Sequence, residues 1–293
     1  MKAFASVHPF LLLFYFLSVL SVSMFVQNPV LQGAALLGGI LFSATLQKRR
    51  ALPGDLGFYL PLFFLVAVTN PLFSHNGVTP LFFLNGNPVT LEAILYGIAL
   101  AGTVLGVLLW CKCYSAIMTS DKFLYLFGRA IPRLALVLSM ALRFVPLFRR
   151  QMRRVRLAQK AMGLYSARGV VDKIRSTGRV FLAMIAWSLE NAMETAASMK
   201  ARGYGTGRRT NFSLFRFTAR DGVLLSVSAV LFGVTIFAAA TGDTYFTFYP
   251  RISGLGLSVP AIAAYVTFTL LTPLPFVMEM KEVVLWNYYR SKI

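Results

Sequence analysis

The stretch Phe148-Arg-Arg-Gln-Met-Arg-Arg-Val-Arg-Leu-Ala-Gln-Lys-Ala-Met162 lies in the middle of a chain that is otherwise strongly apolar. In a helix, Phe148, Met152 and Val155 share one face, and most of the remaining surface carries arginines and a lysine. The surrounding segment, residues 119–222, holds 20 of the 29 Lys and Arg residues of the chain. The pattern predicts an amphipathic helix with a basic face, inside a long basic segment between apolar runs.

The composition is typical of a polytopic membrane protein. Of the 293 residues, 57% are hydrophobic and 13% are charged, whereas soluble domains contain about 25% charged residues. In a soluble protein, the formal net charge of +19 would suggest nucleic-acid binding. Here the positive charge is concentrated in one segment between apolar runs. The bias of Lys and Arg toward cytoplasmic loops explains this better, so we expect no nucleic-acid partner.

Six apolar runs are long enough, or nearly so, to cross a membrane as helices. They are residues 10–26, 30–46, 56–73, 90–118, 223–241 and 258–277. Gln47-Lys48-Arg49-Arg50 follows the second run and indicates a cytoplasmic loop. Residues 74–88 contain no Lys, Arg, Asp or Glu and are expected outside. This alternation predicts that both termini and the basic segment are cytoplasmic.

The expected fold class is therefore all-α, in three parts. N-terminal membrane helices occupy residues 1–118, a basic cytoplasmic domain occupies residues 119–222, and C-terminal membrane helices with a cytoplasmic tail occupy residues 223–293. In the fourth run, Gly102 and Gly106 form a GxxxG pair, and Gly97 adds a third small residue. Such residues let helices approach closely in lipid, so we interpret them as packing positions.

Two helices are predicted within the basic segment. The first starts after Pro132 and continues to about Met162, with a bend expected at Pro146 because proline cannot donate a helical hydrogen bond. The second runs from Val171 to Lys200. Its most apolar part, residues 180–189, is too short to span a bilayer, which needs about 20 residues. Alanines give this helix a smooth surface for close packing.

The motifs of common catalytic and metal sites are missing from the sequence. It has no GxxxxGK[ST] loop, no HExxH and no GxSxG. Cys111 and Cys113 can build neither a disulfide framework nor a four-ligand metal site, and His8 and His75 are expected to have a structural or interfacial role. Ionisable residues are nearly missing from the apolar runs, so an ion relay has no stepping stones. We predict no catalytic residue, no metal site and no cofactor, and energy for any transport would come from elsewhere.

The tripeptide Ala-Arg-Gly occurs twice in the basic segment, at residues 167–169 and 201–203, each time after a predicted helical run. Glycine after a helix can take the left-handed conformation that closes its last turn, and arginine suits the negative end of the helix dipole. Two ordinary helix C-caps would therefore explain the motifs. Alternatively, arginine offers a rigid five-donor fork, and two equivalent tripeptides would suit a partner with two equivalent grooves.

These motifs resemble those of the transmembrane T component of energy-coupling factor (ECF) transporters for vitamins and metals, a group that includes the permease subunit of cobalt transporters. The similar stretches are Ala161-Met-Gly-Leu-Tyr-Ser-Ala-Arg-Gly169, Ala197-Ser-Met-Lys-Ala-Arg-Gly-Tyr-Gly205, residues 70–84, residues 90–93 and Ala141-Leu-Arg-Phe-Val-Pro146. The resemblance covers most of the chain from about residue 28 onward.

The resemblance implies a non-enzymatic scaffold in a prokaryotic plasma membrane. Two cytoplasmic ABC-type ATPase subunits would bind ATP and Mg²⁺, and a membrane S component would bind the vitamin or metal ion, so no residue of this chain would encode the substrate. Two long coupling helices would cross in an X, and each Ala-Arg-Gly end would dock in a groove of one ATPase.

Carried over by position, the six docking residues are Ala167, Arg168, Gly169, Ala201, Arg202 and Gly203. The arginines would dock, the alanines would allow close approach and the glycines would mark the helix ends. The expected contacts with the S component are two apolar faces, formed by Phe148, Met152 and Val155 and by Ala183, Ala186 and Ala197.

Three alternatives stay open at this point. A conventional ABC permease would carry the substrate itself, but it would need a polar pathway through its own spans. A membrane enzyme acting on lipid head groups would need a cluster of acid, base or metal-binding residues at one membrane face. The basic helix could also bind anionic lipid at the inner surface, alone or together with coupling.

Overall fold

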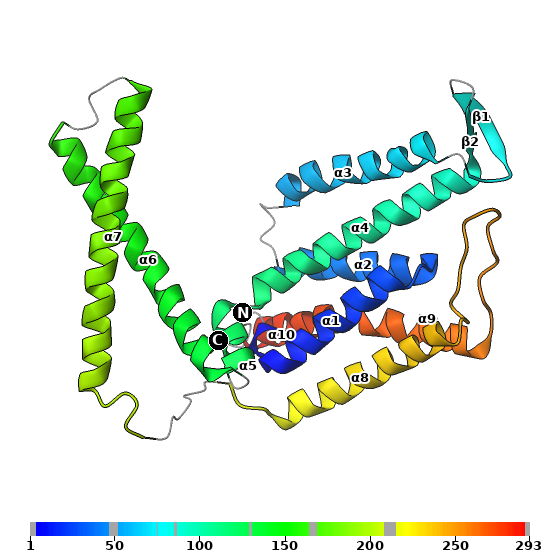
Figure 1. The fold of residues 1–293 in the computed structure, drawn as a ribbon. Helices are drawn as coiled ribbons and strands as arrows, with labels where there is room; N and C mark the ends of the chain where they lie inside the picture. The colour runs from blue at the N-terminus through cyan, green and yellow to red at the C-terminus, as the bar shows by residue number, and fades with distance from the viewer. Residues whose placement is uncertain are drawn as a thin grey trace. The chain divides into compact units, whose positions relative to one another are not determined.

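The computed structural model describes residues 4–46, 52–74, 76–84, 87–128, 131–163, 169–207 and 215–290. It divides into two compact units, residues 124–214 and the remainder of the chain, which are described separately. The first unit contains a short 3₁₀ helix (Phe4–Ser6), α1 (Pro9–Phe25), α2 (Pro29–Leu46), α3 (Leu52–Phe73), β1 (Pro80–Leu84), β2 (Asn87–Thr90), α4 (Leu91–Ile117), α8 (Ala219–Ala240), α9 (Val259–Leu271) and α10 (Leu274–Arg290) (Figure 1). Helix α5 (Ser120–Gly128) lies at the division, and the second unit contains α6 (Pro132–Ala161) and α7 (Val170–Ala201).

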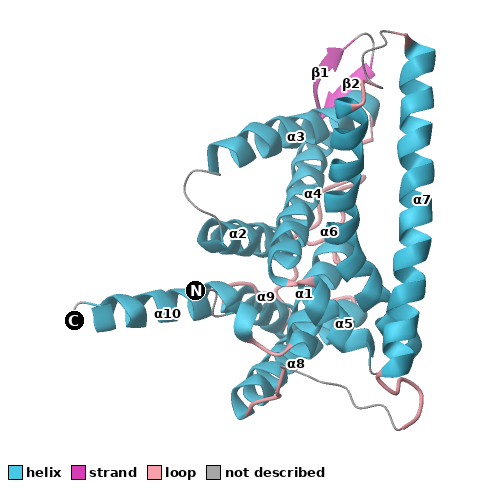
Figure 2. Ribbon diagram, turned by 90° about the vertical axis from the view of Figure 1, so that its left-hand side faces the viewer, coloured by secondary structure: helices cyan, strands magenta, loops and turns pink. Residues whose placement is uncertain are grey.

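Helices dominate both units, as Figure 2 shows. Within the described residues, four segments are long and apolar enough to cross a membrane, namely Pro29–Leu46, Leu91–Ile117, Ala219–Ala240 and Val259–Arg290. Pro9–Phe25 and Gly57–Phe73 are shorter apolar helices. The predicted all-α membrane fold is confirmed. Residues 219–222, which the sequence analysis placed in the basic domain, instead form the first turn of α8, because Thr218 and Asp221 cap that helix reciprocally.

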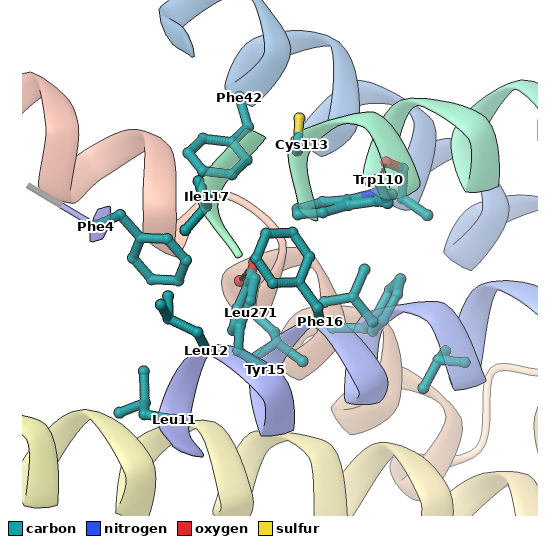
Figure 3. Close-up of a cluster of buried hydrophobic side chains, with 14 of the residues drawn as sticks. Phe4, Leu11, Leu12, Tyr15, Phe16, Phe42, Trp110, Cys113, Ile117 and Leu271 are labelled. Carbon is teal, nitrogen blue, oxygen red and sulfur yellow. Dashed lines mark hydrogen bonds between the residues drawn. The ribbon is translucent and has the colours of Figure 1, made fainter. Parts of the chain in front are cut away.

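An aromatic cluster forms the core of the first unit (Figure 3). Phe4, Tyr15, Phe16, Phe42 and Trp110 are all at most 2% exposed. Their rings meet mostly edge to face, at centroid distances such as 5.4 Å for Phe4 and Tyr15 and 6.0 Å for Phe16 and Trp110. Edge-to-face pairs gain energy beyond the area that they bury. These side chains join α1, α2 and α4, so the many phenylalanines of the chain serve helix packing here.

The last predicted span, residues 258–277, is interrupted in the structure and forms two helices, α9 and α10. Pro275 has no backbone N–H, so it cannot donate to the carbonyl of Leu271, four residues earlier. The hydroxyl of Tyr15 in α1 lies 3.0 Å from that oxygen and 3.1 Å from the carbonyl oxygen of Thr272. A break at membrane depth requires such replacement donors. Helix α10 then continues to Arg290, through residues that the sequence analysis assigned to a tail.

Three charged side chains hold the backbone before α1, and we call them the N-terminal clamp. Glu279 of α10 accepts a hydrogen bond from the N–H of Phe4 at 3.1 Å. Lys122 of α5 donates to the carbonyl of Ala5, and Asp221 of α8 accepts from the N–H of His8 at 3.3 Å. All three clamp residues are buried. Buried charges are tolerated when they are hydrogen-bonded, and these three satisfy backbone groups that lie outside any long helix.

The loop expected between the third and fourth runs contains an antiparallel β-hairpin, which the sequence analysis missed. β1 pairs with β2 so that Phe82 lies opposite Val89. Thr79 donates its hydroxyl to the carboxylate of Glu92 at 2.7 Å, and Thr90 donates to the carbonyl of Asn76 at 2.9 Å. These bonds fasten the hairpin to the first turn of α4.

Close approach of α3 and α4 depends on Gly97, and not on the GxxxG pair. A Cβ atom at Gly97 would collide with the backbone oxygen of Ala67 in α3. A Cβ atom at Gly106 would make ordinary contacts with Leu36 at 3.7 Å, and one at Gly102 would meet no atom within 4 Å. The predicted packing role therefore holds for Gly97, whereas Gly102 faces open space.

Gly97→Ala is expected to lower the stability of the membrane unit, because the added methyl group must push two backbones apart. Overpacking of this kind costs about 1–3 kcal/mol. The midpoint of thermal unfolding in detergent, followed by size-exclusion chromatography after heating, should fall by several degrees. Gly102→Ala is the matched control on the same helix and should not lower the midpoint. Equal midpoints for the two variants would contradict this account of the α3–α4 contact.

Candidate docking site

Helices α6 and α7 form a long hairpin, and they cross each other in Figure 1. Helix α6 begins with Pro132 in its first turn and continues through Pro146 without interruption. Helix α7 has 32 residues, which corresponds to a length of about 48 Å at about 1.5 Å per residue. We call this pair, residues 132–201, the α6–α7 hairpin.

The seam of the hairpin is apolar with a few polar positions. On α7, Ser176, Val180 and Met184 are buried, and Trp187 is half-buried, so the seam follows steps of four and three residues. The ring of Trp187 lies 6.0 Å from that of Phe144 and 6.3 Å from that of Phe148, both on α6. Trp187 thus joins the two helices. The sequence analysis did not single it out, although its spacing from Val180 and Met184 would have placed it on the seam.

The second Ala-Arg-Gly tripeptide closes α7 with a Schellman motif. Gly203 has a φ of +79°, in the left-handed region that glycine adopts without strain. Its N–H donates to the carbonyl of Lys200, and the N–H of Tyr204 donates to the carbonyl of Met199, each at 3.0 Å. These bonds satisfy the last carbonyls of the helix. The C-cap prediction is therefore confirmed for this tripeptide.

The ending of α7 leaves the tripeptide accessible. Ala201, Arg202 and Gly203 are all exposed, and Arg202 is the C-cap residue. The guanidinium of Arg202 is therefore accessible at the helix end, and the small side chain of Ala201 beside it leaves room for a partner. An exposed guanidinium offers a fixed fork of donors that binds carboxylates and carbonyls with defined direction.

The first tripeptide has a different position. Gly169 is the N-cap of α7, with a φ of −77°, and the prediction that it closes the preceding helix is wrong. Helix α6 ends earlier, where Gly163, at a φ of +71°, donates its N–H to the carbonyl of Lys160. A glycine that closes the last turn was already available six residues before Gly169. Ala167 and Arg168 lie outside the described residues.

The two faces predicted to contact an S component differ in the structure. Phe148, Met152 and Val155 are half-buried, and Phe148 packs against Trp187 of the same hairpin. Ala183, Ala186 and Ala197 are exposed on α7. The alanine face is thus fully open to a partner, whereas the α6 face partly serves the seam. Contact with an S component stays a prediction for both.

The histidines and cysteines form no metal centre within the described part of the chain, where no group of three or more His, Cys, Asp or Glu side chains could hold an ion. His8 is the N-cap of α1, and its Nδ1 accepts from the N–H of Phe10 at 3.3 Å. Partial burial lowers the pKa of His8, with Asp221 opposing that shift. Its predicted structural role fits this contact, and His75 lies outside the described residues.

Comparison with known proteins supports the reading of the motifs. The transmembrane protein EcfT of the energy-coupling factor transporter of Listeria innocua is 29% identical over 195 residues, which cover 59% of this chain and 71% of that protein. EcfT of Lacticaseibacillus paracasei is 33% identical over 112 residues, or 38% of this chain and 42% of that protein. An uncharacterised protein of Mycoplasma pneumoniae, the MG181 homolog, is 29% identical over 177 residues, which cover 56% of this chain and 41% of that protein.

The matched segments thus span less than half of the L. paracasei and M. pneumoniae proteins. The match to a family is broader, since residues 5–213 match the cobalt transport protein family, CbiQ. This range includes both tripeptides, the α6–α7 hairpin and the first membrane helices. The chain therefore belongs to the CbiQ family of cobalt transport proteins, with transmembrane proteins of energy-coupling factor transporters among its relatives, as its motifs predicted.

Proposed function

We propose that this chain is the membrane scaffold of an ECF-type importer, which transmits the closure of two ABC-type ATPase subunits to a substrate-binding S component. The observation that carries the proposal is the exposed Ala201-Arg202-Gly203 end of α7, held by its Schellman motif at the tip of a long helix. Because the chain belongs to a transporter family, we interpret this helix end as a docking site in addition to a C-cap.

The α6–α7 hairpin is suited to carry force. A displacement of one helix is shared by the other only if the two helices are held together. Buried Val180 and Met184, followed by Trp187 between two phenylalanine rings, provide that support. The hairpin would then move as one lever, with one Ala-Arg-Gly docking end at residues 167–169 and the other at residues 201–203.

The remaining roles follow from the same proposal. ATP and Mg²⁺ would bind to the partner ATPases, so the chain itself would need no cofactor and would catalyse no reaction. The vitamin or metal ion would bind to the S component. The S component would in turn pack against the alanine face of α7 and the Phe148 face of α6. The bacterial relatives favour a prokaryotic plasma-membrane location, and the positive-inside bias favours both termini and the α6–α7 hairpin in the cytoplasm.

Purification of the intact complex tests this assignment. The tagged chain, extracted in mild detergent from its native host and analysed by mass spectrometry, should retain one or two kinds of ABC-type ATPase and a second small membrane protein. ATP-driven uptake in proteoliposomes should need all of these subunits. Uptake by this chain and the ATPases alone would reject the scaffold role and favour a conventional permease.

A further inference from the structure

A basic groove lies between the second half of α6 and the first part of α7, with a volume of about 620 Å³. Four cationic side chains line it, from Arg149, Arg153, Arg156 and Lys160. They follow one another at steps of four, three and four residues, so they form a single stripe along α6. The stripe is about 16 Å long at about 1.5 Å per residue.

The other walls of the groove are largely apolar. Met152 and Leu157 flank the stripe on α6, and Val180 lines the groove from α7. The remaining lining residue, Thr177, donates its hydroxyl hydrogen to the carbonyl of Lys173 at 2.8 Å. None of the described residues that line the groove is acidic. Four positive charges therefore face the same space beside apolar side chains, without a carboxylate among them.

We propose that this groove binds the head group of an anionic phospholipid. The positive stripe matches a phosphate, and the apolar walls match the glycerol and the first acyl carbons next to it. Clusters of four to eight Lys and Arg residues on amphipathic helices are a recognised form of binding to anionic lipid. The site would fix the basic half of α6 to the membrane surface, in addition to any protein docking.

The neighbouring part of α6 favours a lipid over an acidic protein as the occupant. Leu134, Val137, Leu138 and Val145 are between 41% and 62% exposed, and Val145 precedes Arg149 by one turn. One continuous helix thus presents exposed apolar side chains and then exposed cations. This order matches the change from acyl chains to phosphates in a lipid monolayer, whereas an acidic protein surface would match only the second half.

Lipid retention measures the binding directly. The full-length chain is placed in nanodiscs with equal amounts of phosphatidylglycerol and phosphatidylcholine, released, and analysed by native mass spectrometry. The groove variant carries Arg149→Gln, Arg153→Gln, Arg156→Gln and Lys160→Gln. The matched control removes the same charge from exposed arginines outside the groove, with Arg150→Gln, Arg154→Gln, Arg175→Gln and Arg179→Gln. We expect the groove variant to retain on the order of tenfold less phosphatidylglycerol than the wild type. The amount retained by the control should fall by less than about twofold, which is close to the experimental scatter.

A third variant separates charge from folding. Arg149→Lys, Arg153→Lys and Arg156→Lys together keep all four charges, and this variant should retain phosphatidylglycerol as the wild type does. Equal losses in the groove variant and the control would overturn the proposal, because net charge alone would then govern retention. Unchanged retention in the groove variant would also overturn it. Retained lipid with loss of a copurifying acidic protein would assign the groove to that protein instead.

Discussion

Arg202→Glu is expected to detach the ATPase subunits from the complex while the chain still inserts into the membrane. Arg202 is exposed at the C-cap of α7, far along the chain from the aromatic core, so the change should not unfold the membrane unit. Reversing a charge in a docked ion pair costs roughly 2–5 kcal/mol, which corresponds to a loss in affinity of roughly 30-fold or more. Copurification of the ATPases with the tagged chain measures this loss.

Two companion variants sharpen the result. Arg179→Glu makes the same charge change at another exposed position of α7 and should leave the ATPases bound. Gly203→Ala keeps the arginine but forces alanine into a left-handed conformation at a φ of +79°, at a cost of about 1–2 kcal/mol. It should therefore weaken docking less than Arg202→Glu does. Gly207→Ala, where a Cβ atom meets no neighbour within 4 Å, is its matched control and should have no effect.

The double variant with Arg168→Glu and Arg202→Glu gives the strictest test of the docking role. If both Ala-Arg-Gly ends are gripped by ATPase grooves, ATP-driven uptake should vanish in proteoliposomes. Normal uptake by this variant would rule out docking through the two arginines. The C-cap function of the second tripeptide would then stand alone.

Trp187→Ala is expected to uncouple ATP hydrolysis from uptake without releasing the ATPases. The indole contacts the rings of Phe144 and Phe148, so its removal breaks the main aromatic contact between α6 and α7. Because Trp187 is only half-buried, its truncation should cost up to about 3 kcal/mol of stability, which is the low end of the range for a truncated tryptophan. The two helices should then slide past each other, while Arg202 stays exposed and functional. Uptake per ATP hydrolysed should fall on the order of tenfold.

Trp187→Phe should restore most of the coupling, because a phenylalanine ring still reaches between the two helices. Ile174→Ala is the control for truncation, since Ile174 lies on α7 with 68% of its surface exposed. It should change neither uptake nor hydrolysis. Full coupling in Trp187→Ala would show that the crossing of α6 and α7 carries no force.

Local pattern was enough to predict the helices and one of the two tripeptide ends. The apolar runs predicted the membrane helices, and the stripe of Phe148, Met152 and Val155 predicted the amphipathic half of α6. Gly203 was predicted correctly because a Schellman motif depends only on neighbouring residues. Gly169 was not, since Gly163 can close α6 equally well and nothing in the tripeptide itself decides between them.

Other features were missed for two different reasons. The β-hairpin had a local signal, because Asn85-Gly86 is the preferred pair of a two-residue hairpin turn. The bonds from Tyr15 to the carbonyls of Leu271 and Thr272 join residues more than 250 positions apart. Trp187 depends in the same way on the pairing of α6 with α7. Such contacts follow from tertiary packing, which a pattern in one segment does not contain.

The N-terminal clamp determines when the membrane unit can finish folding. A ribosome delivers the chain in order, yet Phe4 bonds to Glu279, which is made 275 residues later, and His8 bonds to Asp221, which is made 213 residues later. Until α8 and α10 have been inserted, the N–H groups of residues 4 and 8 lack these acceptors. Closure of the bundle thus joins parts of the chain that are made more than 200 residues apart. A chain that stops before α10 would lack the Glu279 acceptor for the N–H of Phe4.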